Sequence, residues 1–221
     1  MAADGIEFAI DDLGSGYSNL DRLVDLPFTQ VKLDRSIVQR LWSHPLSTLA
    51  IVDGVVQAGH EANRTVVFEG IERLELLEVA QILSADFAQG FVIAKPMPAK
   101  EVESWLAKFT LPEASPNESA SVFGARIRSV LGALAYVWRE VHQHGDGLPN
   151  DWRDCPVDTF LGRTFGAMSP MMVLHRRLHH EGLAISETYQ RLSAELDRCQ
   201  RGLLSGSAVA GAVSRDELII D

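Results

Sequence analysis

Through the first half of the chain, short apolar runs alternate with longer segments in which apolar residues recur three and four positions apart. The short runs lie at residues 7–10, 30–33, 65–68 and 87–93 and are rich in β-branched and aromatic residues, as strands are. The longer segments, at 17–26, 46–58 and 74–83, have the spacing of amphipathic helices. This alternation predicts an α/β fold in which parallel strands are joined by right-handed helical crossovers.

The pattern changes after a stretch rich in Pro, Ser, Asn and Glu. Residues 101–109 predict one more helix, and residues 112–121 have the composition of a linker. Beyond the linker, helical periodicity is found at 123–141, 168–180 and 185–203. We therefore predict four parts, which are an N-terminal α/β domain at 1–111, a linker at 112–121, a helical sensory or dimerisation region at 122–204 and a flexible tail at 205–221.

Composition and charge narrow the classes of function. Of the 221 residues, 46% are hydrophobic and 23% are charged, as in a folded globular protein. The formal net charge of −10 argues against binding of DNA or RNA polymers, because their phosphates attract basic surfaces. No apolar stretch has the roughly 18–20 residues that a membrane span needs. Because the two cysteines form no disulfide framework, we expect a cytoplasmic protein with no membrane contact of its own.

Polar residues stand where each predicted strand ends. In parallel βα folds the carboxyl ends of the strands meet at one edge, so these residues are expected to converge. Clustered carboxylates call for hard divalent cations such as Mg²⁺ or Mn²⁺, and a pair of such ions can clamp a phosphodiester. A lysine beside them can orient water or stabilise charge on phosphate. The residues concerned are Asp11, Asp12, Lys32, Asp34, Glu69, Glu72 and Gln89.

Each of these motifs also has a purely structural interpretation. An Asp-Asp pair before glycine, as in Asp11 and Asp12, is common where a strand turns into a loop. Glu69 and Glu72 would also be favourable as acidic residues at the start of a helix. The occurrence of four such motifs in order favours the functional interpretation over the structural one.

Four stretches, taken in order, resemble the motifs of EAL domains, the phosphodiesterase domains of cyclic di-GMP signalling. They are FAIDDLGSGYSNL at 8–20, VKLDRS at 31–36, VVFEGIE at 66–72, and QGF with KPMP at 89–98. The resemblance implies the last four βα units of a (β/α)₈ TIM-type barrel, and the helical C-terminal domain predicted from periodicity follows them. It also implies hydrolysis of cyclic di-GMP to linear pGpG with two divalent metals.

The same resemblance assigns roles to the polar residues. Asp11, Asp12 and Glu69 correspond to metal ligands, and Lys32, with Glu69, to the group near the attacking water. The remaining residues, Asp34, Glu72 and Gln89, correspond to positions behind the ligands or in the nucleotide pocket.

Because the resemblance covers only residues 1 to about 110, we expect the isolated chain to be catalytically incomplete. Its open sheet edges require a cover. The C-terminal helices, a second copy of the chain or a separate chain carrying the complementary barrel half are possible covers, and the interpretation we favour is a piece of a larger signalling protein. The alternative function is a non-catalytic nucleotide-binding or protein-interaction module.

A second candidate site lies in the helical region. His175 and His179 share one helix face, and with Cys155 they form a set that can bind Zn²⁺. The set has a faint resemblance to a chemoreceptor zinc-binding module, which implies a zinc-responsive regulator. The structural alternative is a solvated basic helix face, with Cys155 as a small buried apolar residue.

Overall fold

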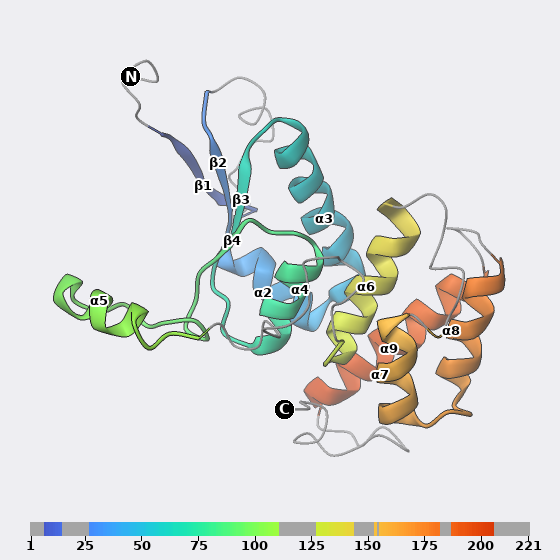
Figure 1. Ribbon diagram of the computed structural model, residues 1–221. Helices are drawn as coiled ribbons and strands as arrows, with labels where there is room; N and C mark the ends of the chain where they lie inside the picture. Colours follow the sequence, from blue (N-terminus) through green and yellow to red (C-terminus); the bar gives the residue numbers. More distant parts are fainter. Residues whose placement is uncertain are drawn as a thin grey trace.

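The computed structural model describes residues 7–14, 27–110, 127–143, 153, 155–181 and 187–205. Four parallel strands form one sheet in the order β1-β2-β3-β4, which confirms the expected α/β fold (Figure 1). The bounds are β1 Ala9–Leu13, β2 Gln30–Leu33, β3 Thr65–Phe68 and β4 Phe87–Ala88. The helix expected at 17–26, the linker at 112–121 and the tail from 206 on lie outside the described residues.

Two of the strands differ from the sequence prediction. β2 and β3 have the predicted bounds, but the strand expected at 7–10 runs from Ala9 to Leu13, and the strand expected at 87–93 ends at Ala88. β4 is short because the chain turns at Gly90, where the backbone passes against that of Ile71. Residues 91–93 form a turn in place of the expected strand.

Three helices follow the strands and cover one face of the sheet. They are α2 (Arg35–Ser43), α3 (Pro45–Glu61) and α4 (Leu74–Ile82). The periodicity had not predicted α2. Its start is fixed by Asp34, whose carboxylate accepts a hydrogen bond of 2.8 Å from the backbone N–H of Ser36. Pro45 then begins α3, because proline is favourable in the first helical turn.

The two faces of the sheet differ in burial. Val31 and Leu33 of β2 are fully buried, and α3 packs directly on β2 and β3. Lys32 lies between Val31 and Leu33 and points to the other face of the sheet. It pairs with Val67 of β3, which in turn pairs with Phe87 of β4. Phe87 is 55% exposed. One face of the sheet is therefore packed against helices, and the other presents both apolar and charged groups.

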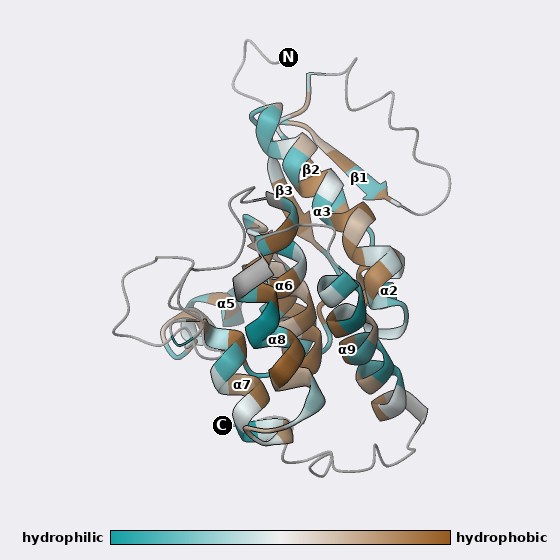
Figure 2. Cartoon of the chain, turned by 90° about the vertical axis from the view of Figure 1, so that its right-hand side faces the viewer, coloured by the Kyte–Doolittle hydropathy of each residue, from teal (hydrophilic) through white to brown (hydrophobic). Residues whose placement is uncertain are grey.

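The C-terminal helices form a further layer over α2, α3 and α4. They are α6 (Val130–Gln143), α7 (Pro156–Phe165), α8 (Pro170–Glu181) and α9 (Glu187–Ser205), with apolar and polar sides to each helix (Figure 2). α6 packs on α3 and α4, and α9 packs on α2, so one hydrophobic core runs through both layers. α7 was not expected from periodicity, and α6 begins seven residues later than the predicted helix at 123–141.

One further helix stands away from this body. α5 (Ala99–Leu106) projects to the left in Figure 1 and has no fully buried residue. Among the described residues, no helix is both long and apolar enough to span a bilayer.

The contact between α4 and α6 contains a buried carboxyl group. Glu78 of α4 accepts hydrogen bonds from the backbone N–H of Arg128, at 2.7 Å, and from the hydroxyl of Ser129, at 2.5 Å, just before α6 begins. A side chain on Gly132 would overlap this carboxyl group. Burial raises the pKa of Glu78 from 4.5 to about 7, outweighing the two hydrogen bonds, which lower it.

Replacement of Glu78 by glutamine should flatten the dependence of stability on pH. The folded carboxyl keeps its proton between about pH 4.5 and 7, where the unfolded one loses it, so the free energy of unfolding falls as pH rises through this window. The fall should be on the order of 2–3 kcal/mol in the parent chain and near zero in Glu78→Gln. Urea denaturation at pH 5 and pH 7.5 measures this decrease in the free energy of unfolding. An equal fall in both proteins would contradict the assignment, and Glu61→Gln, at an exposed position on α3, is the control.

Candidate functional site

The first candidate site begins at an irregularity in β1. Ile10 pairs with Val31 and Leu13 with Leu33, so β1 has one residue more than β2 over this stretch. The extra residue is accommodated with Asp12 at a φ of 57°, a left-handed conformation that aspartate tolerates. In a regular strand, Asp11 and Asp12 would point to opposite faces. The irregularity lets both carboxylates approach Glu69, with ligand atoms of the three residues within 4.8 Å of one another.

Lys32 lies between two of these carboxylates. Its ammonium group forms an ion pair of 2.7 Å with Asp11 Oδ1 and a second, close ion pair with Glu69. The hydrogen bond to Asp11, followed by the one to Glu69, raises the pKa of Lys32 above its usual value and outweighs the opposing effect of burial. The lysine is therefore fully charged at neutral pH and offsets part of the negative charge of the cluster.

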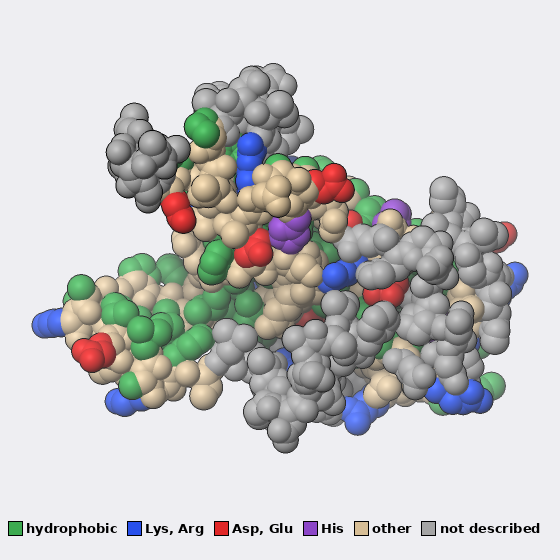
Figure 3. All heavy atoms as spheres, turned by 45° about the horizontal axis from the view of Figure 1, so that its top comes forward, with side chains coloured by type: hydrophobic (Ala, Val, Ile, Leu, Met, Phe, Trp, Pro, Cys, Tyr) green, Lys and Arg blue, Asp and Glu red, His purple; other side chains and the backbone are tan. Residues whose placement is uncertain are grey.

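A groove of about 460 Å³ continues from this edge of the sheet. Glu72 and Gln89, both predicted site residues, line it. Arg35, at its rim, forms an ion pair of 2.7 Å with Glu72. The opposite wall is apolar and continues to α5, where Figure 3 shows hydrophobic side chains gathered on the projecting lobe. Exposed members of this lobe are Phe91, Val102 and Leu106.

The structure brings most of the predicted residues to one edge of the sheet but gives Asp34 a separate position. The Asp34 carboxylate is engaged by Ser36 at the start of α2. Sequence reasoning missed Arg35 as a site residue, although it lies in the VKLDRS motif next to Asp34. Its importance becomes visible only through its ion pair with Glu72, which is distant in sequence.

The donor set at the first site suits hard divalent cations. Three carboxylates offer only oxygen atoms, which Mg²⁺ and Mn²⁺ prefer. Asp11 and Asp12 are exposed, and Glu69 is 13% exposed, so incoming ions can reach the cluster from solvent. The residues present therefore fit the metals that the motifs imply.

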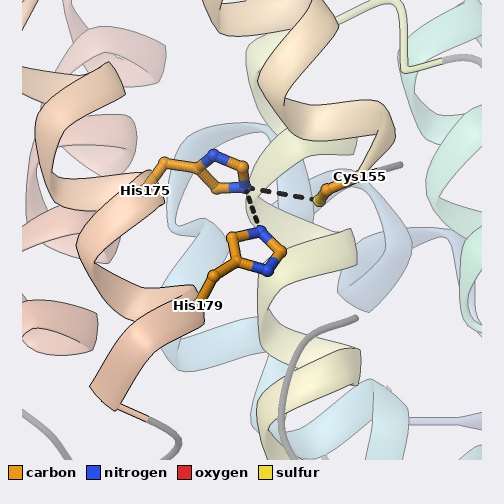
Figure 4. A group of neighbouring side chains, drawn as sticks. All are labelled: Cys155, His175 and His179. Atoms are coloured by element: carbon orange, nitrogen blue, oxygen red, sulfur yellow. Dashed lines mark hydrogen bonds between the residues drawn. The ribbon is translucent and has the colours of Figure 1, made fainter. Parts of the chain in front are cut away.

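The second candidate site is assembled from α7 and α8, as Figure 4 shows. Cys155, just before α7, and His175 and His179, one helical turn apart on α8, point toward one another. The Cys155 Sγ lies 3.3 Å from His175 Nε2, which lies 3.2 Å from His179 Nε2. The three predicted zinc-binding residues thus form one cluster, and the cluster faces the protein interior at Cys155 and His175.

Burial controls the protonation of this cluster. It raises the pKa of the Cys155 thiol to about 12 and, helped by the neighbouring His179, lowers the pKa of His175 to about 3. At neutral pH the cluster therefore holds a thiol and a neutral imidazole. Asp158 Oδ1, which accepts a hydrogen bond of 3.0 Å from Arg176 Nε, lies 3.6 Å from His175 Nδ1. Sequence reasoning missed Asp158, although its position three residues after Cys155 places it on the first turn of α7.

Comparison with known proteins finds similarity in the part of the chain that carries the first site. The family model of the EAL domain matches residues 1–96. The oxygen sensor protein DosP of Escherichia coli is 36% identical over 103 residues, which are 47% of this chain and 13% of that protein. The cyclic di-GMP phosphodiesterase RocR of Pseudomonas aeruginosa is 42% identical over 98 residues, which are 42% of this chain and 24% of RocR.

One solved structure is similar over part of its length. The crystal structure of the EAL domain of Mycobacterium smegmatis DcpA has 36% sequence identity, with a TM-score of 0.46 over 50% of this chain and 49% of that chain. The N-terminal part of this chain is thus similar to part of an EAL domain, and the resemblance expected from its motifs is confirmed. The chain spans no more than about a quarter of the two curated relatives described above.

Proposed function

We propose that residues 7–110 form half of a (β/α)₈ barrel that hydrolyses cyclic di-GMP to linear pGpG, and that the 221-residue chain alone supplies only part of the active site. The observation that carries the proposal is the convergence of Asp11, Asp12, Glu69 and Lys32 at one edge of a parallel sheet. These positions are distant in sequence, and a common ligand is the simplest reason for their meeting.

The two faces of the sheet support the barrel. Helices cover the face of Val31 and Leu33, as they cover the outside of a (β/α)₈ barrel. The other face would then be the barrel interior, which accounts for the mixture of Lys32 with apolar Val67 and Phe87 there. The remaining strands would come from another polypeptide segment, on the same chain, in a second copy or in a different protein.

The metals, when bound by Asp11, Asp12 and Glu69, would supply an activated water and neutralise phosphate charge. Lys32 would hold the carboxylates in place and, with its positive charge, stabilise an incoming phosphate oxygen. Arg35 and Glu72 fix each other at the rim of the groove. Its apolar wall would receive a nucleotide base, and Gln89 would offer hydrogen bonds to the base edge.

The test is metal binding and hydrolysis by the purified chain. Calorimetric titration should show that Mn²⁺ binds, and chromatography should show no pGpG formed from cyclic di-GMP by the chain alone. Addition of a polypeptide carrying the first four βα units of an EAL barrel should restore turnover. Asp11→Ala or Glu69→Ala should lower this restored turnover at least about a hundredfold, because each removes a metal-binding oxygen.

Glu61→Ala, which removes an exposed carboxylate on α3, is the matched control and should leave turnover unchanged. If the chain alone hydrolyses cyclic di-GMP and Asp11→Ala abolishes this, the proposed incompleteness is wrong and copies of the chain complete the barrel. Tight binding of cyclic di-GMP without turnover in any mixture would favour the non-catalytic binding module.

The cluster at Cys155, His175 and His179 favours a second function, zinc-responsive regulation by the helical layer. We infer that zinc binds there because three soft or borderline donors converge in a buried position. Purified chain dialysed against zinc should retain one ion per chain by elemental analysis. Cys155→Ser with His179→Ala should retain none, and retention by that double variant would place the zinc elsewhere.

A further inference from the structure

The cluster of α7 and α8 has three donor atoms, all within 4.8 Å of one another. Four donors around zinc, at about 2.0–2.3 Å each, lie about 3.3–3.8 Å from one another. The distances from His175 Nε2 to Cys155 Sγ and to His179 Nε2, 3.3 Å and 3.2 Å, are close to this range. Zinc in a buried, closed site takes four protein donors, so one corner of the tetrahedron requires a further group.

The ribbon of α6 runs directly behind the cluster in Figure 4. It carries Tyr136, a side chain that is only 1% exposed. The Tyr136 hydroxyl is buried and has no hydrogen-bond partner among the described residues, an arrangement that costs about 1–3 kcal/mol. Burial, followed by the negative charge of Cys155 when that thiol is ionised, raises the pKa of Tyr136. The helix behind the cluster thus carries a buried hydroxyl that no described residue engages in a hydrogen bond, and the set of metal donors has three members.

We propose that the Tyr136 hydroxyl is the fourth donor, so that the helical layer holds a divalent metal through Cys155, His175, His179 and Tyr136. The inference rests on the zinc site proposed above and names its missing ligand. Binding breaks the S–H bond of Cys155 and the O–H bond of Tyr136, and both protons pass to solvent while the imidazoles stay neutral. No electron is transferred.

Charge balance supports a phenolate in this position. One thiolate and one phenolate cancel the two positive charges of Zn²⁺, which leaves a neutral centre. A net charge would be costly in a site as buried as this one, where His175 is 0% exposed. Glu140 of α6 is also buried and interacts electrostatically with Cys155 and Tyr136, so its carboxylate is the competing oxygen donor.

The test is zinc titration of the full chain, followed by ultraviolet difference spectroscopy. Ionised tyrosine has its own absorption band, so we expect one tyrosinate per zinc ion and release of two protons. The chain has three tyrosines, and the band should vanish in Tyr136→Phe and persist in Glu140→Gln. Tyr136→Phe should bind zinc at least about tenfold more weakly. Tyr136→His, which offers an imidazole instead, should bind zinc stoichiometrically without the band.

The outcomes separate the ligand from the site. If zinc binds through Cys155 and the two histidines with no tyrosinate band, and Tyr136→Phe binds it equally well, Tyr136 is not the fourth donor although the site stands. If zinc binds without the band, and Glu140→Gln weakens binding with circular dichroism unchanged while Tyr136→Phe does not, the fourth donor is Glu140 and the proposal is overturned. If the parent chain binds no zinc, both the site and its fourth ligand fail.

Discussion

Gly90→Ala should destabilise the chain by more than about 4 kcal/mol, a loss that few single substitutions reach. A Cβ at position 90 would overlap the backbone nitrogen, carbonyl carbon and oxygen of Ile71. The neighbouring group is main chain, so it cannot rotate away as a side chain would. The only relief is to separate the two loops that follow β3 and β4.

Separation of these loops would also disrupt the first candidate site. Ile71 donates to Gln89 O at 3.0 Å and accepts from Val92 N at 3.1 Å, and Gln89 N donates to Phe68 O at 2.9 Å. Together, these hydrogen bonds hold the loop that carries Glu69 and Glu72 in place. Gly90→Ala should therefore lose Mn²⁺ binding together with stability, as urea denaturation and calorimetry would show.

Gly54→Ala is the matched control for this substitution. Gly54 lies within α3, and a Cβ there would meet no atom of the described residues within 4 Å. Alanine at an exposed helical position should stabilise the chain by up to about 1 kcal/mol. If Gly90→Ala were as stable as Gly54→Ala, the close approach of the two loops would be wrong.

Zinc should raise the stability of the chain by about 4 kcal/mol when its free concentration exceeds the dissociation constant a thousandfold. The cluster joins the start of α7 to α8, so metal binds the folded arrangement far better than the unfolded chain. Thermal denaturation with zinc and then with a chelator measures the difference. His179→Ala should abolish it, and a zinc-dependent shift that survives in this variant would exclude the cluster.

His44→Ala is the control for loss of a histidine. His44 lies between α2 and α3, far in sequence from the cluster. It should leave the stabilisation by zinc intact, because it contributes no donor to the group of Cys155, His175 and His179.

The hydrophobic pattern of the sequence predicted most strands and the longer helices, but it missed two short helices. Alternating apolar runs were sufficient for β2, β3 and α4, because each buries a continuous face. α2 and α7 were missed, since each depends on a local start signal more than on periodicity, Asp34 in one case and Pro156 after Cys155 in the other. Their short length hides the repeat on which sequence reasoning relies.

For the candidate sites too, the sequence predicted some features and missed others. Motif order was enough to nominate Asp11, Asp12 and Glu69, and the structure places them together. The order of the motifs could not reveal that the irregularity in β1 turns both aspartates toward Glu69. Nor could spacing reveal Tyr136, because a hydroxyl becomes a candidate donor only once its burial and lack of a partner are known.

The partly uncovered face of the sheet has a consequence for handling the chain in solution. Phe87 and the lobe around Phe91 are apolar surfaces that can adhere to those of another copy. At a net charge of −10, copies repel one another, and this repulsion keeps the surfaces apart in dilute buffer. Added salt shortens the range of the repulsion to about 8 Å at physiological ionic strength. Clear solutions at low ionic strength should therefore become turbid as salt is added.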